Sequence, residues 1–124
     1  MKLRIQALSL EDKNSVGALP SDQISYFKVL SYSKDNLVAE LSYHYNPQHG
    51  QVWIGGYLLD KNSRVISRGF WPTAANQTGT TTIKVGVDPS IGPVQSKWIF
   101  FWLYESNKGE GFVSKRFPYT HYWN

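Results

Sequence analysis

Hydrophobic and polar residues alternate along most of this chain, as they do in β-strands whose two faces meet different surroundings. In residues 79–88, for example, Ile83, Val85 and Val87 alternate with Lys84 and Gly86. Clusters rich in Gly, Pro, Asn, Asp or Ser separate such runs and indicate turns. The pattern predicts strands over residues 3–10, 24–33, 37–45, 51–59, 63–71, 79–88, 96–105 and 111–117.

Short strands at near-regular spacing predict an all-β fold, an antiparallel β-sandwich of about seven to eight strands. No stretch of ten or more residues has the period of an amphipathic helix. The short meanders, with a long loop over residues 89–94, resemble an immunoglobulin- or fibronectin-type sandwich. The cysteines of true immunoglobulin domains are absent, so the resemblance concerns the fold only. A small β-barrel is the alternative, although OB-type barrels usually contain a helix that this pattern lacks.

The length of 124 residues predicts a single domain over residues 1–124. Because the chain has no cysteine, disulfides and thiolate metal sites are excluded. We expect neither a signal peptide nor a membrane span, since no apolar run has the required length, and this is compatible with a cytoplasmic location. Thirteen basic and nine acidic residues give a net charge of +4, but only Lys115 and Arg116 are adjacent basic residues. We therefore do not expect a nucleic-acid partner, which needs a focused basic surface.

Residue types that carry catalysis show no recognisable arrangement. His44, His49 and His121 lack metal-ligand spacing, and we expect three unrelated imidazoles, exposed or half-buried. No nucleophile elbow or phosphate-binding loop is present. Most carboxylates fall in predicted turns, and Glu40 is expected on the solvent side of its strand. We expect a protein that is not an enzyme, with no metal and no cofactor; a glycosidase pair of remote carboxylates is a distant alternative.

Aromatic residues make up 15% of the chain and crowd into two strands that the predicted sandwich places side by side, 51–59 and 96–105. Both registers of these strands are apolar, whereas a sandwich strand ordinarily buries one face only. Branched aliphatic residues suit the interior, which assigns one register to the core: Val52, Ile54, Leu58, Ile99, Phe101 and Leu103. The other register would form an outer aromatic face with a shallow hole at Gly55: Trp53, Tyr57, Trp98, Phe100, Trp102, Tyr104 and Arg116. Phe112 could extend this face, and the Arg116 guanidinium could stack on a ring.

Three interpretations of the outer aromatic face are open. A loop over 11–23 or the tail 119–123 could cover it and make it a second small core, because large exposed apolar patches are rare. A partner protein or a second copy could bind it, because Trp, Tyr and Arg anchor interfaces. A sugar ring could stack on its Trp and Tyr rings. We favour a non-catalytic interaction or accessory module that uses this face for protein–protein contact or self-association, with a carbohydrate-binding module as the alternative.

Overall fold

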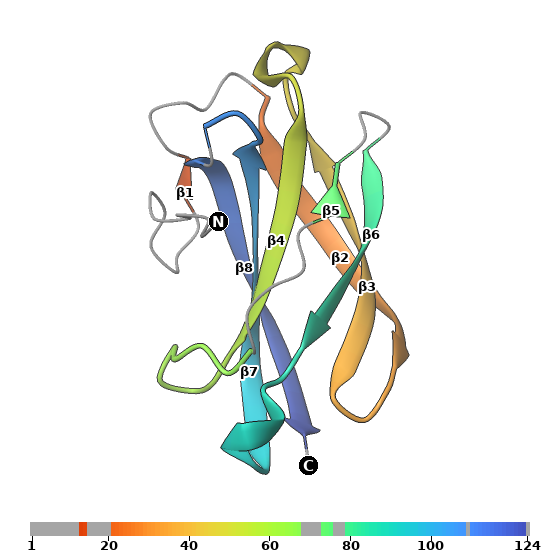
Figure 1. Ribbon diagram of the computed structural model, residues 1–124, viewed down its shortest axis with the longest axis vertical. Helices are drawn as coiled ribbons and strands as arrows, with labels where there is room; N and C mark the ends of the chain where they lie inside the picture. Colours follow the sequence, from red (N-terminus) through yellow and green to blue (C-terminus); the bar gives the residue numbers. More distant parts are fainter. Residues whose placement is uncertain (1–12, 15–20, 68–72, 76–78, 109, 124) are drawn as a thin grey trace.

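Two antiparallel β-sheets lie face to face in the computed structural model of the chain (Figure 1). The structure describes residues 13–14, 21–67, 73–75, 79–108 and 110–123. The strands are β1 (Lys13–Asn14), β2 (Gln23–Tyr32), β3 (Asn36–His44), β4 (Val52–Leu59), β5 (Thr73–Ala74), β6 (Thr80–Gly86), β7 (Val94–Glu105) and β8 (Glu110–Trp123), with single 3-10 turns η1 (Pro47–His49) and η2 (Pro89–Ile91). Within these residues, no helix is long and apolar enough to cross a membrane.

The strand order identifies the sandwich as immunoglobulin-like. One sheet has five strands in the order β1-β8-β7-β4-β5, and the other has three in the order β2-β3-β6. The chain passes from one sheet to the other after β1, β3, β5 and β6, so that β2 to β8 follow the fibronectin-type arrangement. The predicted fold class, an antiparallel β-sandwich of seven to eight strands, is confirmed.

The core lies between the two sheets and follows the predicted alternation. All six residues assigned to the interior from the sequence are fully buried: Val52, Ile54, Leu58, Ile99, Phe101 and Leu103. They meet the inward residues of β3 and β6, which include Leu37, Leu41, Ile83 and Val85. On the outer side of β3, Glu40 pairs with Lys28 of β2 at 3.6 Å, which confirms that this carboxylate faces solvent.

Some predicted boundaries are wrong. Lys13–Asn14 was expected in a loop but forms β1 against Val113 and Ser114 of β8. Of the predicted strand 63–71, the described residues 63–67 form only isolated bridges, at Val65 and Ser67. Residues 68–71 lie outside the described residues, as does the predicted strand 3–10. Short pieces of this kind carry too little alternation to be recognised from a sequence.

The last strand continues beyond its predicted end. β8 runs to Trp123, although Pro118 interrupts its sequence, and residues 119–123 are therefore not a loose tail. The register between β7 and β8 shifts between the Ser96 and Trp98 pairs, next to Pro118. A proline is tolerated at such an irregularity because it removes only one ladder hydrogen bond. The C-terminal residues thus belong to the five-stranded sheet and do not cover its outer aromatic face.

Candidate binding face

The outer aromatic face is assembled by β4, β7 and β8, which run side by side in the five-stranded sheet (Figure 1). Residues opposite one another in a sheet point to the same side, so the register decides which side chains meet. The facing pairs of β4 and β7 on this side are Trp53 with Tyr104, Gly55 with Trp102, Tyr57 with Phe100, and Leu59 with Trp98. Arg116 of β8 lies opposite Phe100. The structure thus brings all seven predicted residues onto one face. It adds Leu59, which lies two residues after Tyr57 and therefore on the same side of β4.

Trp102 occupies the centre of this face and lies directly on Gly55. A Cβ atom at Gly55 would be 2.3 Å from the indole Cζ2 atom of Trp102, much less than a van der Waals contact. The rings of Tyr57 and Phe100 flank the indole, with centroids 5.0 and 5.6 Å away. The hole that the sequence predicted at Gly55 is therefore filled by the indole of the neighbouring strand.

Burial divides the face into a centre and a rim. Phe100, Trp102 and Tyr104 are only 3%, 0% and 2% exposed, and they form a second buried cluster with Leu59. Trp53, Tyr57 and Trp98 contact this cluster but are only partly buried. Burial raises the pKa of the Tyr57 and Tyr104 phenols above the ordinary tyrosine value. The side chains accessible for contact are therefore those of the rim, whereas the centre acts as a small core.

Arg116 at the rim contacts both an aromatic ring and a neighbouring turn. Its guanidinium carbon lies 5.0 Å from the centroid of the Trp98 ring, the cation–π arrangement that the sequence suggested. Its Nη1 also donates a hydrogen bond to Ser63 Oγ at 3.1 Å. The turn that carries Ser63 is fixed by Asp60, whose carboxylate accepts from the backbone N–H groups of Asn62 and Arg64. The cation is thus presented in a fixed orientation next to an aromatic ring.

Phe112 does not belong to the outer aromatic face, so this part of the prediction is wrong. The register between β7 and β8 shifts between the Leu103 and Tyr104 pairs, which are opposite Val113 and Gly111. Phe112 is the extra residue of this bulge, and it lies with Val113 in the main core. Alternation cannot reveal a bulge, because the inserted residue looks like any other member of the strand.

A second arrangement, which the sequence did not suggest, is built around His49, next to Phe112. His49 was expected in a turn with an exposed or half-buried ring, but it is buried and stacked on Phe112 with ring centroids 3.8 Å apart. Its Nε2 is 2.7 Å from Asp22 Oδ2, and its Nδ1 is 2.5 Å from Glu105 Oε2. Both ring nitrogens therefore contact carboxylate oxygens, and the imidazole joins the start of β2, η1 and the end of β7.

The contacts of Glu105 explain the sign of its pKa shift. Burial alone would raise the pKa of this carboxyl, but the hydrogen bond with His49 and the interactions with Lys108 outweigh it, so its pKa lies below the ordinary value. Lys108 Nζ is 3.2 Å from the second carboxylate oxygen. No group of three His, Asp or Glu side chains within the described ranges is arranged to hold a metal ion. The other two histidines fit the expectation, since His44 is exposed and His121 is half-buried.

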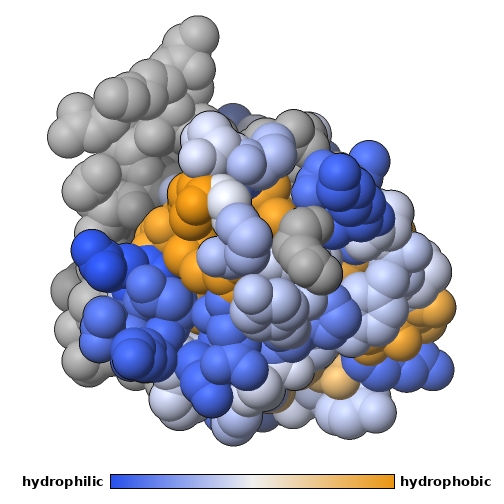
Figure 2. Space-filling view, turned by 90° about the horizontal axis from the view of Figure 1, so that it is seen from below, coloured by the Kyte–Doolittle hydropathy of each residue, from blue (hydrophilic) through white to orange (hydrophobic). Residues whose placement is uncertain are grey.

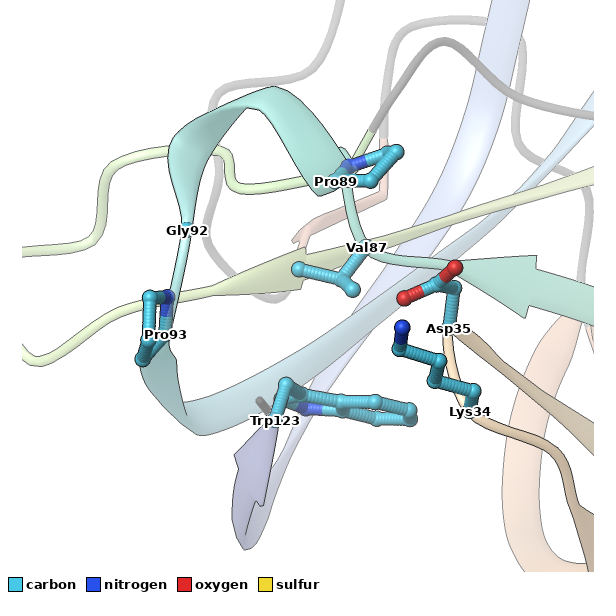
Figure 3. A pocket seen from close by; sticks show the side chains of 7 residues that line it. All are labelled: Lys34, Asp35, Val87, Pro89, Gly92, Pro93 and Trp123. Carbon is cyan, nitrogen blue, oxygen red and sulfur yellow. The ribbon is translucent and has the colours of Figure 1, made fainter.

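A small hollow at the lower end of the sandwich is separate from the outer aromatic face. Figure 2 shows this end, where hydrophilic residues surround separate hydrophobic areas. The hollow, of about 140 Å³, is lined by Lys34, Asp35, Val87, Pro89, Gly92, Pro93 and Trp123 (Figure 3). Trp123 is buried, and its Nε1 donates to Ser96 Oγ at 3.1 Å. Because ligand pockets usually enclose roughly 300–1,000 Å³, this hollow is too small for a typical ligand.

No protein-family model matches the sequence, and no curated protein matches it either. Among solved structures, the chain is similar to a glycosyl hydrolase family 2 member from Bacteroides cellulosilyticus DSM 14838, with 12% sequence identity and a TM-score of 0.43. This similarity covers 81% of the present chain and 14% of that chain.

Proposed function

We propose that this domain is a non-catalytic interaction module that associates with a second copy of itself through the rim of the outer aromatic face. The observation that supports the proposal is the division of this face: a buried centre of Phe100, Trp102 and Tyr104, and a partly exposed rim that includes Trp53 and Trp98. Aromatic side chains and arginine are the residue types that anchor protein interfaces, and the rim combines both.

The buried centre favours binding at the rim because it fixes the rim residues before a partner arrives. Trp98 packs against the buried cluster and is covered by the Arg116 guanidinium, and Tyr57 lies against the Trp102 indole. Side chains that are already ordered lose less conformational entropy on association than mobile ones. We propose a second copy as the partner because symmetric dimers are the commonest soluble oligomers and need only one self-complementary face.

Sedimentation velocity over a range of protein concentrations tests self-association. The full chain should form a dimer as its concentration rises, and replacing both Trp53 and Trp98 by serine should keep it monomeric. Tyr26→Ser is the matched control, since Tyr26 is 56% exposed but lies on β2 of the other sheet, and this variant should still dimerise. A wild-type chain that remains monomeric at every concentration would contradict the proposal, as would a rim variant that dimerises normally.

Carbohydrate binding is the second candidate, and the spacing of two rim rings favours it. Trp53 and Tyr57 are partly exposed on the same side of β4 and four residues apart, which corresponds to about 13 Å along a strand. Rings in a row can stack on successive sugars of a polysaccharide chain. Affinity electrophoresis in gels that contain soluble glucans or xylans tests this candidate. Retardation that is lost in the Trp53→Ser chain but kept in Tyr26→Ser would support it, and unretarded migration in these gels would count against it.

A further inference from the structure

Two tyrosines from different sheets meet at the seam where β2 passes β8. The Tyr119 hydroxyl donates a hydrogen bond to the Tyr32 hydroxyl, although the two residues are 87 positions apart in the sequence. Tyr32 is 52% exposed, and Tyr119 is half-buried. The two phenols therefore touch at their hydroxyl ends, at a place that solvent-borne reagents can reach.

Stacked rings hold both phenols in this arrangement. The His121 ring lies parallel to that of Tyr32, with centroids 4.6 Å apart, and it is also nearly parallel to the Tyr119 ring at 6.2 Å. Phe27 packs edge-on against Tyr119 from the inner side, at 6.0 Å. Burial, together with the contact with Tyr32, raises the pKa of the Tyr119 phenol. Tyr119 thus keeps its proton and remains a hydrogen-bond donor to Tyr32 over the physiological pH range.

We infer that Tyr32 and Tyr119 form a modification site at which a one-electron oxidant, such as a haem peroxidase using hydrogen peroxide, joins the two sheets through a dityrosine bond. Each phenol gives up one electron and its hydroxyl proton. The two phenoxyl radicals combine through the ring carbons next to the oxygens, and each coupled ring returns the hydrogen of that carbon to its oxygen as it regains aromaticity. Two tyrosines and one hydrogen peroxide thereby give one dityrosine and two waters.

Tyr32 and Tyr119 differ from Tyr26, Tyr122, Tyr43 and Tyr45 in combining exposure to solvent with contact between two phenols. Tyr26 and Tyr122 are 56% and 58% exposed, but neither has a tyrosine hydroxyl as a hydrogen-bond partner within the described part of the chain. Tyr43 and Tyr45 stack at 6.0 Å, but both are buried and thus protected from an oxidant in solution. Accessibility and proximity coincide at Tyr32 and Tyr119.

A bond at this site would act on the fold as a disulfide does. It would close a loop of 87 residues and so restrict the unfolded chain, which raises the stability of the folded one. It would also tie β2, an outermost strand of the three-stranded sheet, to β8 of the five-stranded sheet. The chain has no cysteine, so no disulfide can supply such a link.

Treatment of the 124-residue chain at low concentration with a haem peroxidase and hydrogen peroxide tests this inference. We expect monomeric protein that has lost two hydrogen atoms by mass spectrometry, shows dityrosine fluorescence and contains linked peptides with Tyr32 and Tyr119. This linked monomer should melt at a higher temperature than the untreated protein. Tyr32→Phe and Tyr119→Phe should each lose the intramolecular product, whereas Tyr26→Phe should retain it.

Peptide mapping of the wild-type chain decides the outcome even if a Phe variant folds poorly, which circular dichroism would reveal. A bond found at other tyrosines, or only between molecules, would overturn the inference. So would an undiminished intramolecular product in a folded Tyr119→Phe chain.

Discussion

Replacing Gly55 by alanine is expected to displace the Trp102 indole from the centre of the outer aromatic face. The added Cβ would lie 2.3 to 2.7 Å from three indole carbons, whereas carbon atoms prefer about 3.5–4.0 Å, so the ring must move by about 1 Å. Overfilling a well-packed core costs about 1–3 kcal/mol of unfolding free energy. Because the Trp102 ring is fully buried, we expect a cost near the upper end of this range, about 3 kcal/mol. Alanine suits the backbone, since Gly55 has no positive φ, and it restricts the unfolded chain by about 0.4–1 kcal/mol. The net loss of unfolding free energy should be about 2 kcal/mol.

Urea denaturation followed by circular dichroism measures this loss, and Gly56→Ala is the matched control. A Cβ at Gly56 faces the core at 3.1 Å from Val85 and 3.2 Å from Phe101, contacts that shifts of a few tenths of an ångström relieve. Gly56→Ala should therefore cost less than Gly55→Ala. Removing the indole should also rescue the substitution, because the added Cβ would then no longer meet the ring carbons, so Gly55→Ala should cost less in a Trp102→Leu background. Unchanged stability of Gly55→Ala, or an equal cost in both backgrounds, would refute the contact between Gly55 and Trp102.

Further predictions concern the two faces of β7 and the His49 cluster. Trp102→Ala and Phe101→Ala should each lower the unfolding free energy by about 3–5 kcal/mol in urea titrations, because both rings are fully buried. A Trp102→Ala chain of unchanged stability would contradict the burial of the outer aromatic face at its centre. His49→Ala should cost about 3–5 kcal/mol by the same assay, since it removes the imidazole from a fully buried Asp22 carboxylate, and a cost within error of zero would contradict this role. Because the pKa of Glu105 is lowered in the folded state, its carboxylate contributes fully to stability when the pH is above the ordinary glutamate pKa of about 4.3. This contribution is lost as the pH falls through the folded-state pKa of Glu105. Glu105→Gln should therefore flatten the acid side of the stability curve, and an unaltered pH dependence would argue against the His49 contact.

The alternation of apolar residues was sufficient to predict the sandwich and the inward side of β4 and β7. Ile54 and Phe101 could be assigned to the core because a side-chain period of two places each register on one face. The same period placed Trp53 and Trp102 on the other face. Pairing of β4 with β7 follows from the fibronectin-type strand order, which the spacing of the strands suggested.

The remaining features depend on contacts between segments that are remote in the sequence. A register tells which residues share a face but not whether that face is covered, so the burial of Phe100 and Trp102 could not be predicted. His49 becomes buried because the ends of β2 and β7 bring Asp22 and Glu105 to its ring, and no local pattern links these three positions. The bulge at Phe112 shifts the register by one residue without a compositional signal.

Fluorine NMR of the full chain labelled with fluorotryptophan tests the central claim, association through the rim, most directly. Trp53 and Trp98 are partly exposed on the rim, whereas Trp102 and Trp123 are buried and serve as internal references in the same spectrum. On dilution through the range in which sedimentation detects dissociation, the Trp53 and Trp98 resonances should shift, while those of Trp102 and Trp123 should stay in place. Resonances of Trp53 and Trp98 that do not change with concentration would contradict the account.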